Sequence, residues 1–348
     1  MRVMITGHSG YIGPVMTRLF HRAGHQVVGF DTGYFRDLME DAADEYIPDT
    51  EIRGDIRDID QGAFRGIEAV VHLAALSNDP IGDIVATKTE DINAGGTARA
   101  GAMAKKAGVR RFVMASSCSL YGKAADSLSP LDETARLAPA SAYARSKVAG
   151  EAALTELADG NFEPILLRNA TAYGVSPRMR LDLVLGNLMA YGYATGVIRV
   201  LSDGTPWRPM VHIEDISRAA LAAVEAPIGS LAHRVFNVGG RDGNYTVRQI
   251  AEVAAKVLPD CRIEISAEAG NDPRSYRVDF TRVLNELPGF NPQWTLERGA
   301  VELYDWMRRH DADLSRLLGE NYIRLRRIQA LREGNRIDAD FRWTTAQG

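Results

Sequence analysis

A strand-like segment that runs directly into three evenly spaced glycines opens the chain. Arg2–Thr6 has the short apolar pattern of a buried strand, and Gly7, Gly10 and Gly13 follow it. The next residues, 15–20, have the periodicity of a helix. A strand, a tight glycine turn and a helix N-terminus present backbone N–H groups and the positive end of a helix dipole to an anion. This order of elements predicts a βαβ unit whose first turn holds a pyrophosphate.

A carboxylate at the end of the second strand pattern selects the kind of dinucleotide. Residues 26–30 are typical of the next buried strand, and Asp31 stands at its end. A carboxylate in this place accepts hydrogen bonds from ribose hydroxyls and repels a 2′-phosphate. The sequence therefore favours NAD over NADP, and the three glycines and Asp31 are predicted to bind it.

A tyrosine and a lysine four residues apart, Tyr143 and Lys147, carry the candidate chemistry. On a helix, two residues at this spacing share one face. A free tyrosine has a pKa of about 10 and is a poor base at neutral pH. A neighbouring ammonium and a cationic nicotinamide would together stabilise the phenolate. Two such residues often only share a solvated helix face, so the catalytic interpretation of this pair depends on the glycine motif and on Ser117 upstream.

Strand and helix patterns alternate as far as about residue 170, which predicts a parallel sheet covered on both faces. Further candidates follow this alternation, with strands at 69–73, 111–115 and 164–168 and helices near 93–107 and 142–157. Beyond Gly174 the pattern is less regular. We predict an α/β fold, a Rossmann-type doubly wound parallel sheet with a smaller, discontinuous α/β substrate domain.

Together these motifs resemble the extended short-chain dehydrogenase/reductases, the NAD-dependent epimerase/dehydratase family that remodels nucleotide-activated sugars. The resemblance spans about residues 1–300. Besides the glycine motif and the Tyr143/Lys147 pair, it rests on the segments 54–58, 71–75, 116–122, 167–168, 173–174 and 211–215 and on Arg208. The set is specific for the family but not for one reaction within it.

The resemblance implies a division of the chain and a set of ligand contacts. An NAD-binding Rossmann domain is expected over 1–170 plus about 212–239, and a nucleotide-sugar-binding domain over about 171–211 plus 240–309. The implied cofactor contacts are Gly7, Gly10, Tyr11, Ile12, Gly13, Asp31, Asp55, Ile56, Leu73, Ala74, Ala75, Tyr143 and Lys147. The implied substrate contacts are Ser117, Thr171, Arg208 and Arg274, the arginines because a planar guanidinium suits phosphate oxygens.

Thr171 departs from the family pattern, which usually has asparagine there. A threonine offers one hydroxyl in place of an amide with separate donor and acceptor, so we expect an unusual substrate or pose. Asn169 stands two residues earlier and is expected on the other side of the strand.

The function that these residues predict is an NAD-dependent nucleotide-sugar epimerase acting at C4 through a transient 4-keto intermediate. Tyr143, Lys147 and Ser117 are the predicted catalytic residues, and no other chemistry is needed. The alternatives are a 4,6-dehydratase, a net 4-oxidase or a ketoreductase and, in a different class, a non-catalytic NAD-sensing protein. Where the family's dehydratases carry an acidic pair, this chain has Cys118 and Ser119, which do not supply the acid and base that water loss needs. Cys118 is interpreted as a buried free cysteine, with a catalytic role as the alternative.

Composition limits the other possibilities. The 348 residues are 45% apolar, which supports a substantial core, and the net charge of −4 gives no support for nucleic-acid binding. No uncharged apolar run reaches membrane-spanning length, and no metal-ligand spacing is present. Two cysteines are too few for a disulfide framework, and the first strand leaves no room for a signal peptide, so a cytoplasmic enzyme is expected.

Two further expectations concern packing. The resemblance implies a homodimer built from the helices near 93–107 and 142–157, although their small-residue faces could equally pack against the sheet. The segment 310–348 lies beyond the resemblance and is expected to be a helical C-terminal extension. Apolar residues at helical spacing over 321–331 predict a helix there, packed on the body or on a partner subunit.

Overall fold

A seven-stranded parallel sheet forms the centre of the molecule in the computed structural model, which describes residues 1–40, 43–77, 86–122, 129–266, 275–310 and 313–344. Its strands are β1 (Arg2–Thr6), β2 (Gln26–Asp31), β3 (Thr50–Arg53), β4 (Ala69–His72), β5 (Arg111–Ser117), β6 (Glu163–Asn169) and β10 (Val235–Val238). They lie in the order β10-β6-β5-β4-β1-β2-β3, and every adjacent pair is parallel. This is the doubly wound order that the alternating pattern predicts.

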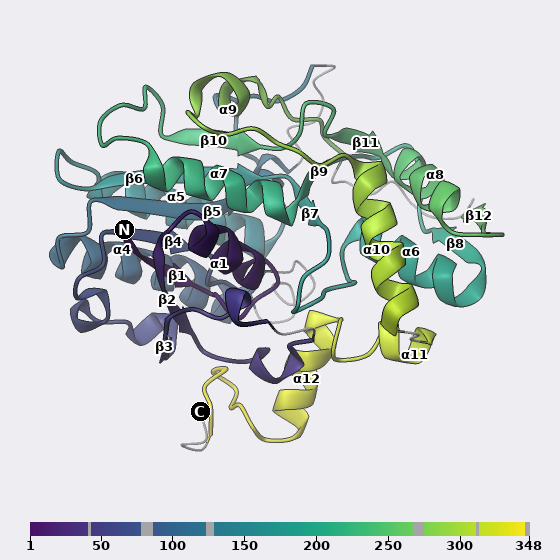
Figure 1. The fold of residues 1–348 in the computed structure, drawn as a ribbon, viewed down its shortest axis with the longest axis horizontal. Helices are drawn as coiled ribbons and strands as arrows, with labels where there is room; N and C mark the ends of the chain where they lie inside the picture. The colour runs from purple at the N-terminus through teal and green to yellow at the C-terminus, as the bar shows by residue number, and fades with distance from the viewer. Residues whose placement is uncertain (41–42, 78–85, 123–128, 267–274, 311–312, 345–348) are drawn as a thin grey trace.

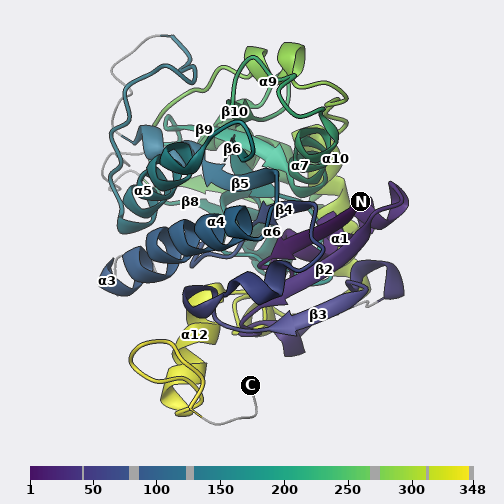
Figure 2. The same ribbon diagram turned by 90° about the vertical axis from the view of Figure 1, so that its left-hand side faces the viewer.

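Helices cover both faces of this sheet, as Figure 2 shows. On one side lie α1 (Gly13–Arg22) and α7 (Ile213–Glu225), and on the other lie α4 (Gly96–Lys106) and α5 (Ala142–Leu157). A π-helical turn, η5 (Glu90–Gly95), leads into α4, so the helix expected near 93–107 begins in a different geometry. Short helices complete this part: α3 (Ala86–Thr89), η1 (Arg36–Leu38), η2 (Asp44–Tyr46), η3 (Ile56–Asp58), η4 (Gln61–Phe64) and η6 (Cys118–Tyr121).

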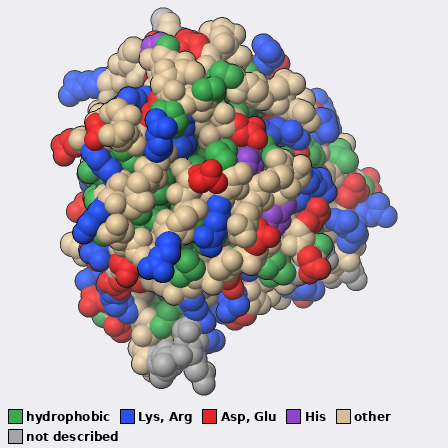
Figure 3. All heavy atoms as spheres, turned by 60° about the vertical axis from the view of Figure 1, so that its left-hand side comes forward, with side chains coloured by type: hydrophobic (Ala, Val, Ile, Leu, Met, Phe, Trp, Pro, Cys, Tyr) green, Lys and Arg blue, Asp and Glu red, His purple; other side chains and the backbone are tan. Residues whose placement is uncertain are grey.

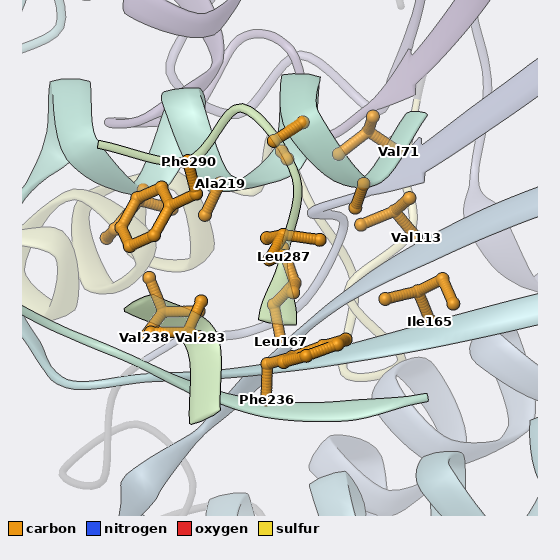
Figure 4. Packing of buried hydrophobic residues seen from close by; sticks show 14 of the residues in the cluster. Val71, Val113, Ile165, Leu167, Ala219, Phe236, Val238, Val283, Leu287 and Phe290 are labelled. Atoms are coloured by element: carbon orange, nitrogen blue, oxygen red, sulfur yellow. The ribbon is translucent and has the colours of Figure 1, made fainter. Parts of the chain in front are cut away.

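The core on the α7 side of the sheet combines β-branched and aromatic side chains with alanines and leucines. Val113 and Ile165 are fully buried, and Figure 4 shows Val71, Val113 and Ile165 in a row on neighbouring strands, with Leu167 next to Phe236. Strands buried on both faces are typically continuous apolar runs, which explains why these strands are readable from sequence. The helix α9 (Thr281–Glu286) and the residues after it pack into this core, although the sequence places them with the second domain.

A second group of elements has its own core cluster, on the right of Figure 1. It contains a three-stranded sheet of β7 (Thr171–Tyr173), β9 (Trp207–His212) and β11 (Asn244–Thr246) and a two-stranded sheet of β8 (Val197–Val200) and β12 (Arg262–Ile265). The helices α6 (Val184–Thr195), α8 (Val247–Val257) and α10 (Leu296–His310) pack around them. A capping box formed by Thr246 and Gln249 fixes the start of α8.

The C-terminal segment returns to the Rossmann sheet. After α11 (Leu314–Leu317), the helix α12 (Arg324–Glu333) and the residues that follow lie beneath the β2–β3 side of the sheet (Figures 1 and 2). Trp343 donates from Nε1 to the carbonyl of Thr32 at 2.7 Å, and the Tyr34 hydroxyl donates to the carbonyl of Phe341. The predicted helix is confirmed, and it packs on the body of the same chain.

The molecular surface carries charges of both signs. On the face drawn in Figure 3, basic and acidic side chains are interspersed, in keeping with the small net charge of −4. Among the described residues, no helix has the length and apolarity needed to cross a membrane.

Candidate active site

A cavity of about 670 Å³ lies at the carboxyl ends of β1, β2, β4, β5 and β6, between the large sheet and the second group of elements. Open parallel sheets bind their ligands at this edge. Predicted site residues from distant parts of the chain line it together: Gly7, Gly10, Tyr11, Ile12, Asp31, Asp55, Ile56, Leu73, Ala74, Ala75, Ser117, Tyr143, Lys147, Thr171 and Arg208. Gly13 lies in the glycine turn but not on the cavity wall, and Arg274 lies outside the described residues.

The glycine turn fits a dinucleotide phosphate because side chains have no room there. Gly7 has φ +77°, and a Cβ on it would lie 2.6 Å from the backbone nitrogen of Ala74. A Cβ on Gly13 would lie 2.1 Å from the carbonyl oxygen of His8. The turn therefore packs backbone against backbone, and α1 begins at Gly13 with no acidic residue in its first turn. Its N-terminal N–H groups and dipole suit a pyrophosphate.

Two carboxylates mark the opposite end of this half of the cavity. Asp31 accepts hydrogen bonds from the backbone N–H of Ser9 at 3.1 Å and of Gly33 at 2.6 Å. Each carboxylate oxygen accepts more than one hydrogen bond, so Asp31 can still receive ribose hydroxyls. Burial alone would raise the pKa of Asp55, but hydrogen bonds from Arg57 outweigh burial and the pKa is lowered. Asp55 therefore remains a carboxylate, and hydrogen bonds hold both side chains in fixed positions.

Tyr143 and Lys147 project from the first turns of α5, whose N-cap is Ser141. Lys147 is 3% exposed, its Nζ donates to the carbonyl of Ala115 at 2.7 Å, and the same Nζ lies 5.7 Å from the centre of the Tyr143 ring. Burial lowers the pKa of Lys147 to about 8, and the charge of Glu151 opposes this effect. Ser117 stands opposite, at the end of β5, where its Oγ accepts from the N–H of Ser119 at 3.1 Å. The arrangement brings a phenol, an ammonium and a hydroxyl to one cavity.

A buried ion pair holds α5 against the sheet. Glu151, one turn beyond Lys147, accepts two-pronged hydrogen bonds from Arg168 of β6 at 3.1 and 2.8 Å. Glu151 also accepts from the Ser116 hydroxyl at 2.5 Å. Sequence reasoning named Arg168 only within a motif and missed Glu151; the signal was an acidic residue four positions after Lys147 on the same helix face.

The structure places Cys118 in the core, whereas Asn169 and Thr171 lie on the cavity wall. Cys118 is fully buried, its Sγ donates to the carbonyl of Arg168 at 3.1 Å, and burial raises its pKa, so its interpretation as a buried free cysteine is confirmed. Asn169 and Thr171 both line the cavity. The expectation that Asn169 points to the other side was wrong, because residues two apart on an extended chain share a face.

Two orphaned polar atoms indicate where the cavity would accept a polar ligand. The Ser119 hydroxyl and the side-chain oxygen of Asn169 are buried without a hydrogen-bond partner in the described parts of the chain, and both residues line the cavity. A buried polar group without a partner is costly, so such atoms mark positions that a bound molecule would satisfy.

Other polar lining residues were not predicted. Sequence reasoning missed Arg180, Asp182, Asn187, Arg199, Tyr276 and Arg324. Arg180 and Asp182 form a hydrogen-bonded ion pair, and Arg180 also donates to the Ser77 hydroxyl at 3.1 Å. A charged pair inside the apolar run 179–188 was the available signal. Arg324 comes from the C-terminal helix, and no periodicity distinguishes it from its neighbouring arginines.

Comparison with known proteins shows what this chain resembles. Residues 3–239 match the sequence profile described as the NAD dependent epimerase/dehydratase family. The chain is 29% identical over 330 residues to a UDP-glucose 4-epimerase of Streptomyces lividans, covering 89% of this chain and 97% of that protein. It is 28% identical to a UDP-glucose 4-epimerase of Bacillus subtilis, covering 87% of this chain and 94% of that protein. A solved structure described as MoeE5 in complex with UDP-glucuronic acid and NAD superimposes with a TM-score of 0.74 at 26% identity, covering 89% of this chain and all of that one.

Proposed function

Because the chain belongs to the NAD-dependent epimerase/dehydratase family, we propose that it is a nucleotide-sugar epimerase that inverts C4 through a transient 4-keto sugar. The observation that carries this proposal is the common cavity of Ser117, Tyr143 and Lys147 with the glycine turn and Asp31. UDP-sugars are the first substrate class to consider, because relatives that match this chain over nearly their whole length are described as acting on or binding them.

The cofactor half of the cavity would be filled by NAD. The glycine turn and α1 would face the pyrophosphate, Asp31 the ribose hydroxyls, and the segment 55–56 the adenine side. Leu73, Ala74 and Ala75 would border the dinucleotide where β4 ends. Bound NAD supplies a hydride acceptor and donor.

The residues of the chain would move the proton and hold the oxygen. The phenolate of Tyr143 takes the proton from the C4 hydroxyl, and the phenol returns it after the ketone has presented its other face. Ser117 donates a hydrogen bond to the same oxygen as it becomes a carbonyl. Lys147 keeps Tyr143 ionised and has donors left for the nicotinamide ribose, because its bond to Ala115 uses one of three.

The substrate half would be formed by the second group of elements. Thr171 and Arg208 line it, together with Asn187 and Arg199. We propose that Thr171 contacts the sugar and that Arg208 contacts the diphosphate, since a guanidinium is suited to phosphate oxygens. Arg274 remains a proposed second diphosphate ligand.

A 4,6-dehydratase is less well supported by the carboxylates of the cavity. Among the described lining residues three are acidic, Asp31, Asp55 and Asp182. The first two lie at the adenosine end, and Asp182 is paired with Arg180. Loss of water needs an acid for the leaving hydroxyl and a base for the C5 proton. None of these three carboxylates belongs to the segment that follows Ser117 at the end of β5.

Two further proposals concern organisation. We propose the two-domain division given above, except that α9 and the residues after it pack with the Rossmann core, and we place the cavity between the two parts. We also propose a homodimer through α5 and the helical segment formed by η5 and α4. Gly95, Ala149 and Ala152 are exposed and free to meet a second copy, whereas Gly101 is already covered by Leu154. Light scattering of the purified protein tests the dimer: a mass of one chain refutes it.

The proposed reaction is tested by incubating the protein with catalytic NAD and a panel of UDP-, dTDP-, GDP- and CDP-sugars. Chromatography with mass spectrometry should find a new peak of unchanged mass. A product lighter by one water would identify a dehydratase, and a change of two hydrogens that scales with added NAD would identify a net oxidase or reductase. Binding of NAD without turnover of any sugar would favour the sensor.

A further inference from the structure

A buried guanidinium that forms no ion pair with a described residue lies on the wall of the cofactor half of the cavity. Arg324, the first residue of α12, lines the cavity and is 3% exposed. Its Nη2 donates to the carbonyl of Arg178 at 2.8 Å, but its Nη1 has no hydrogen-bond partner in the described parts of the chain. A buried charge that lacks a counter-ion is strongly unfavourable. An anionic ligand at this place would remove that penalty.

The surroundings of Arg324 belong to the dinucleotide side of the cavity. Its guanidinium lies 4.3 Å from the centre of the Phe35 ring, just after β2. The adjacent Arg178 donates to the carbonyls of Ser9 and Phe35, both at 3.3 Å, and so ties this region to the glycine turn. Tyr11 of the same turn is within electrostatic range of both Arg324 and Arg180.

Positive charge is concentrated at this point. Burial, followed by the charge of Arg180, lowers the pKa of Arg324 to about 9, although the charge of Asp182 opposes this effect. Arg180 also lines the cavity, but Asp182 and Ser77 already occupy its donors. Of these two lining arginines, Arg324 is the one that has a nitrogen without a hydrogen-bond partner among the described residues.

We propose that Arg324 is a ligand of the dinucleotide pyrophosphate, so that the C-terminal segment contributes directly to cofactor binding. The helix dipole of α1 provides only about half a unit of positive charge, whereas a pyrophosphate carries two negative charges. The unpartnered Nη1 supplies a further donor to this site. Arg324 lies beyond residues 3–239, the part of the chain that matches the family, so this contact is a property of the C-terminal segment.

The proposal rests on NAD as the cofactor but not on the sugar reaction. The substrate also carries a diphosphate, and the two sources are separated by measuring ligands that contain only one of them. NAD and ADP-ribose contain the dinucleotide pyrophosphate, adenosine lacks it, and UDP represents the substrate diphosphate.

The test is titration calorimetry on NAD-free protein, with adenosine measured by competition against ADP-ribose. Arg324→Met should weaken NAD and ADP-ribose by about 10- to 100-fold, as expected for charge-assisted hydrogen bonds to phosphate. Adenosine and UDP should change by less than about twofold. Arg326→Met removes an exposed arginine from the same helix and should change none of the four affinities.

Arg327→Met shows what loosening of the C-terminal helix does to the affinities when the proposed phosphate ligand is kept. Arg327 is buried, pairs with Asp37 at 2.6 Å and does not line the cavity, so its loss loosens the segment without removing a phosphate ligand. If Arg324→Met weakens adenosine as much as ADP-ribose, as a loosened segment would, the proposal is wrong. Unchanged NAD affinity, or a loss confined to UDP, also overturns it.

Arg324→Lys covers the case in which the methionine variant does not fold. Lysine keeps the charge but not the planar pair of donors. It should weaken NAD and ADP-ribose by several-fold and leave adenosine unchanged, and an affinity equal to that of the wild type would contradict the proposal. A wild-type protein that does not bind NAD at all would instead overturn the proposed function.

Discussion

The pH dependence of catalysis should follow the charge of Lys147. The side chain is 3% exposed, and burial lowers its pKa from 10.5 to about 8. The ammonium form therefore predominates below pH 8 and is lost as the pH rises. Because the ammonium stabilises the phenolate of Tyr143, kcat/KM at saturating NAD should fall about five- to tenfold from pH 8 to pH 9 and about tenfold from pH 9 to pH 10. A bound cationic nicotinamide acts in the same direction and moves this decline to lower pH.

Removing the charge of Glu151 should move the decline further. Glu151 raises the pKa of Lys147, so Glu151→Gln should shift the alkaline decline to lower pH. The same substitution leaves Arg168 without its counter-ion, which acts in the same direction and destabilises the fold by about 3 kcal/mol. Glu156→Gln, an exposed site on the same helix, is the matched control and should keep the wild-type profile.

The assay is steady-state kinetics from pH 6 to pH 10, with circular dichroism of each variant at both ends of the range. A kcat/KM that stays level or rises up to pH 10 would refute the role given to Lys147. A folded Glu151→Gln protein whose decline stays at the wild-type pH would refute the electrostatic link between the two residues.

Three further outcomes are expected. Tyr143→Phe should lower kcat by about 10²- to 10⁴-fold while NAD affinity, measured by calorimetry, changes little; retained turnover would remove Tyr143 from the mechanism. Burial lowers the pKa of His72 to about 3, below its value of about 6.5 in the unfolded chain, so wild-type stability should decline below pH 6.5 by up to about 1.4 kcal/mol per pH unit. His72→Gln lacks this group, so the difference between its free energy of unfolding in urea and that of the wild type should narrow as pH falls. A difference that stays constant with pH would contradict the lowered pKa of His72. Trp343→Ala removes a 2.7 Å hydrogen bond to Thr32 and a ring contact with Tyr34, worth about 2 kcal/mol together, so hydrogen exchange in α12 and NAD dissociation should both accelerate, and unchanged exchange would show that Trp343 does not hold the segment.

The sequence predicts those parts of the molecule whose physical cause is local. The strands of the large sheet are recognisable because burial on both faces makes them apolar runs, and Gly7 and Gly13 are recognisable because backbone contact excludes any Cβ. Cys118 could be placed in the core because free cysteine is among the residue types most often buried.

The parts that sequence reasoning missed depend on contacts between distant segments. Glu151 and Arg168 meet only after α5 packs on β6, and Arg324 meets Phe35 only after the chain returns from the second group of elements. The position of Asn169 was mistaken for a different reason, since a spacing of two along an extended chain keeps a side chain on one face. Local spacing therefore places Asn169 and marks the helix face of Glu151, but the partners of Glu151 and Arg324 lie in distant segments that no local window of sequence contains.

The central claim is that one carbon loses a hydride and regains it on its other face. The most direct measurement is the sugar panel incubated in D₂O with catalytic NAD, followed by mass spectrometry and NMR of each product. The account predicts an epimer at C4 with no deuterium on any carbon, because the hydride returns from the cofactor and not from solvent. Deuterium at a carbon of the product, or a product that has lost water, would contradict it.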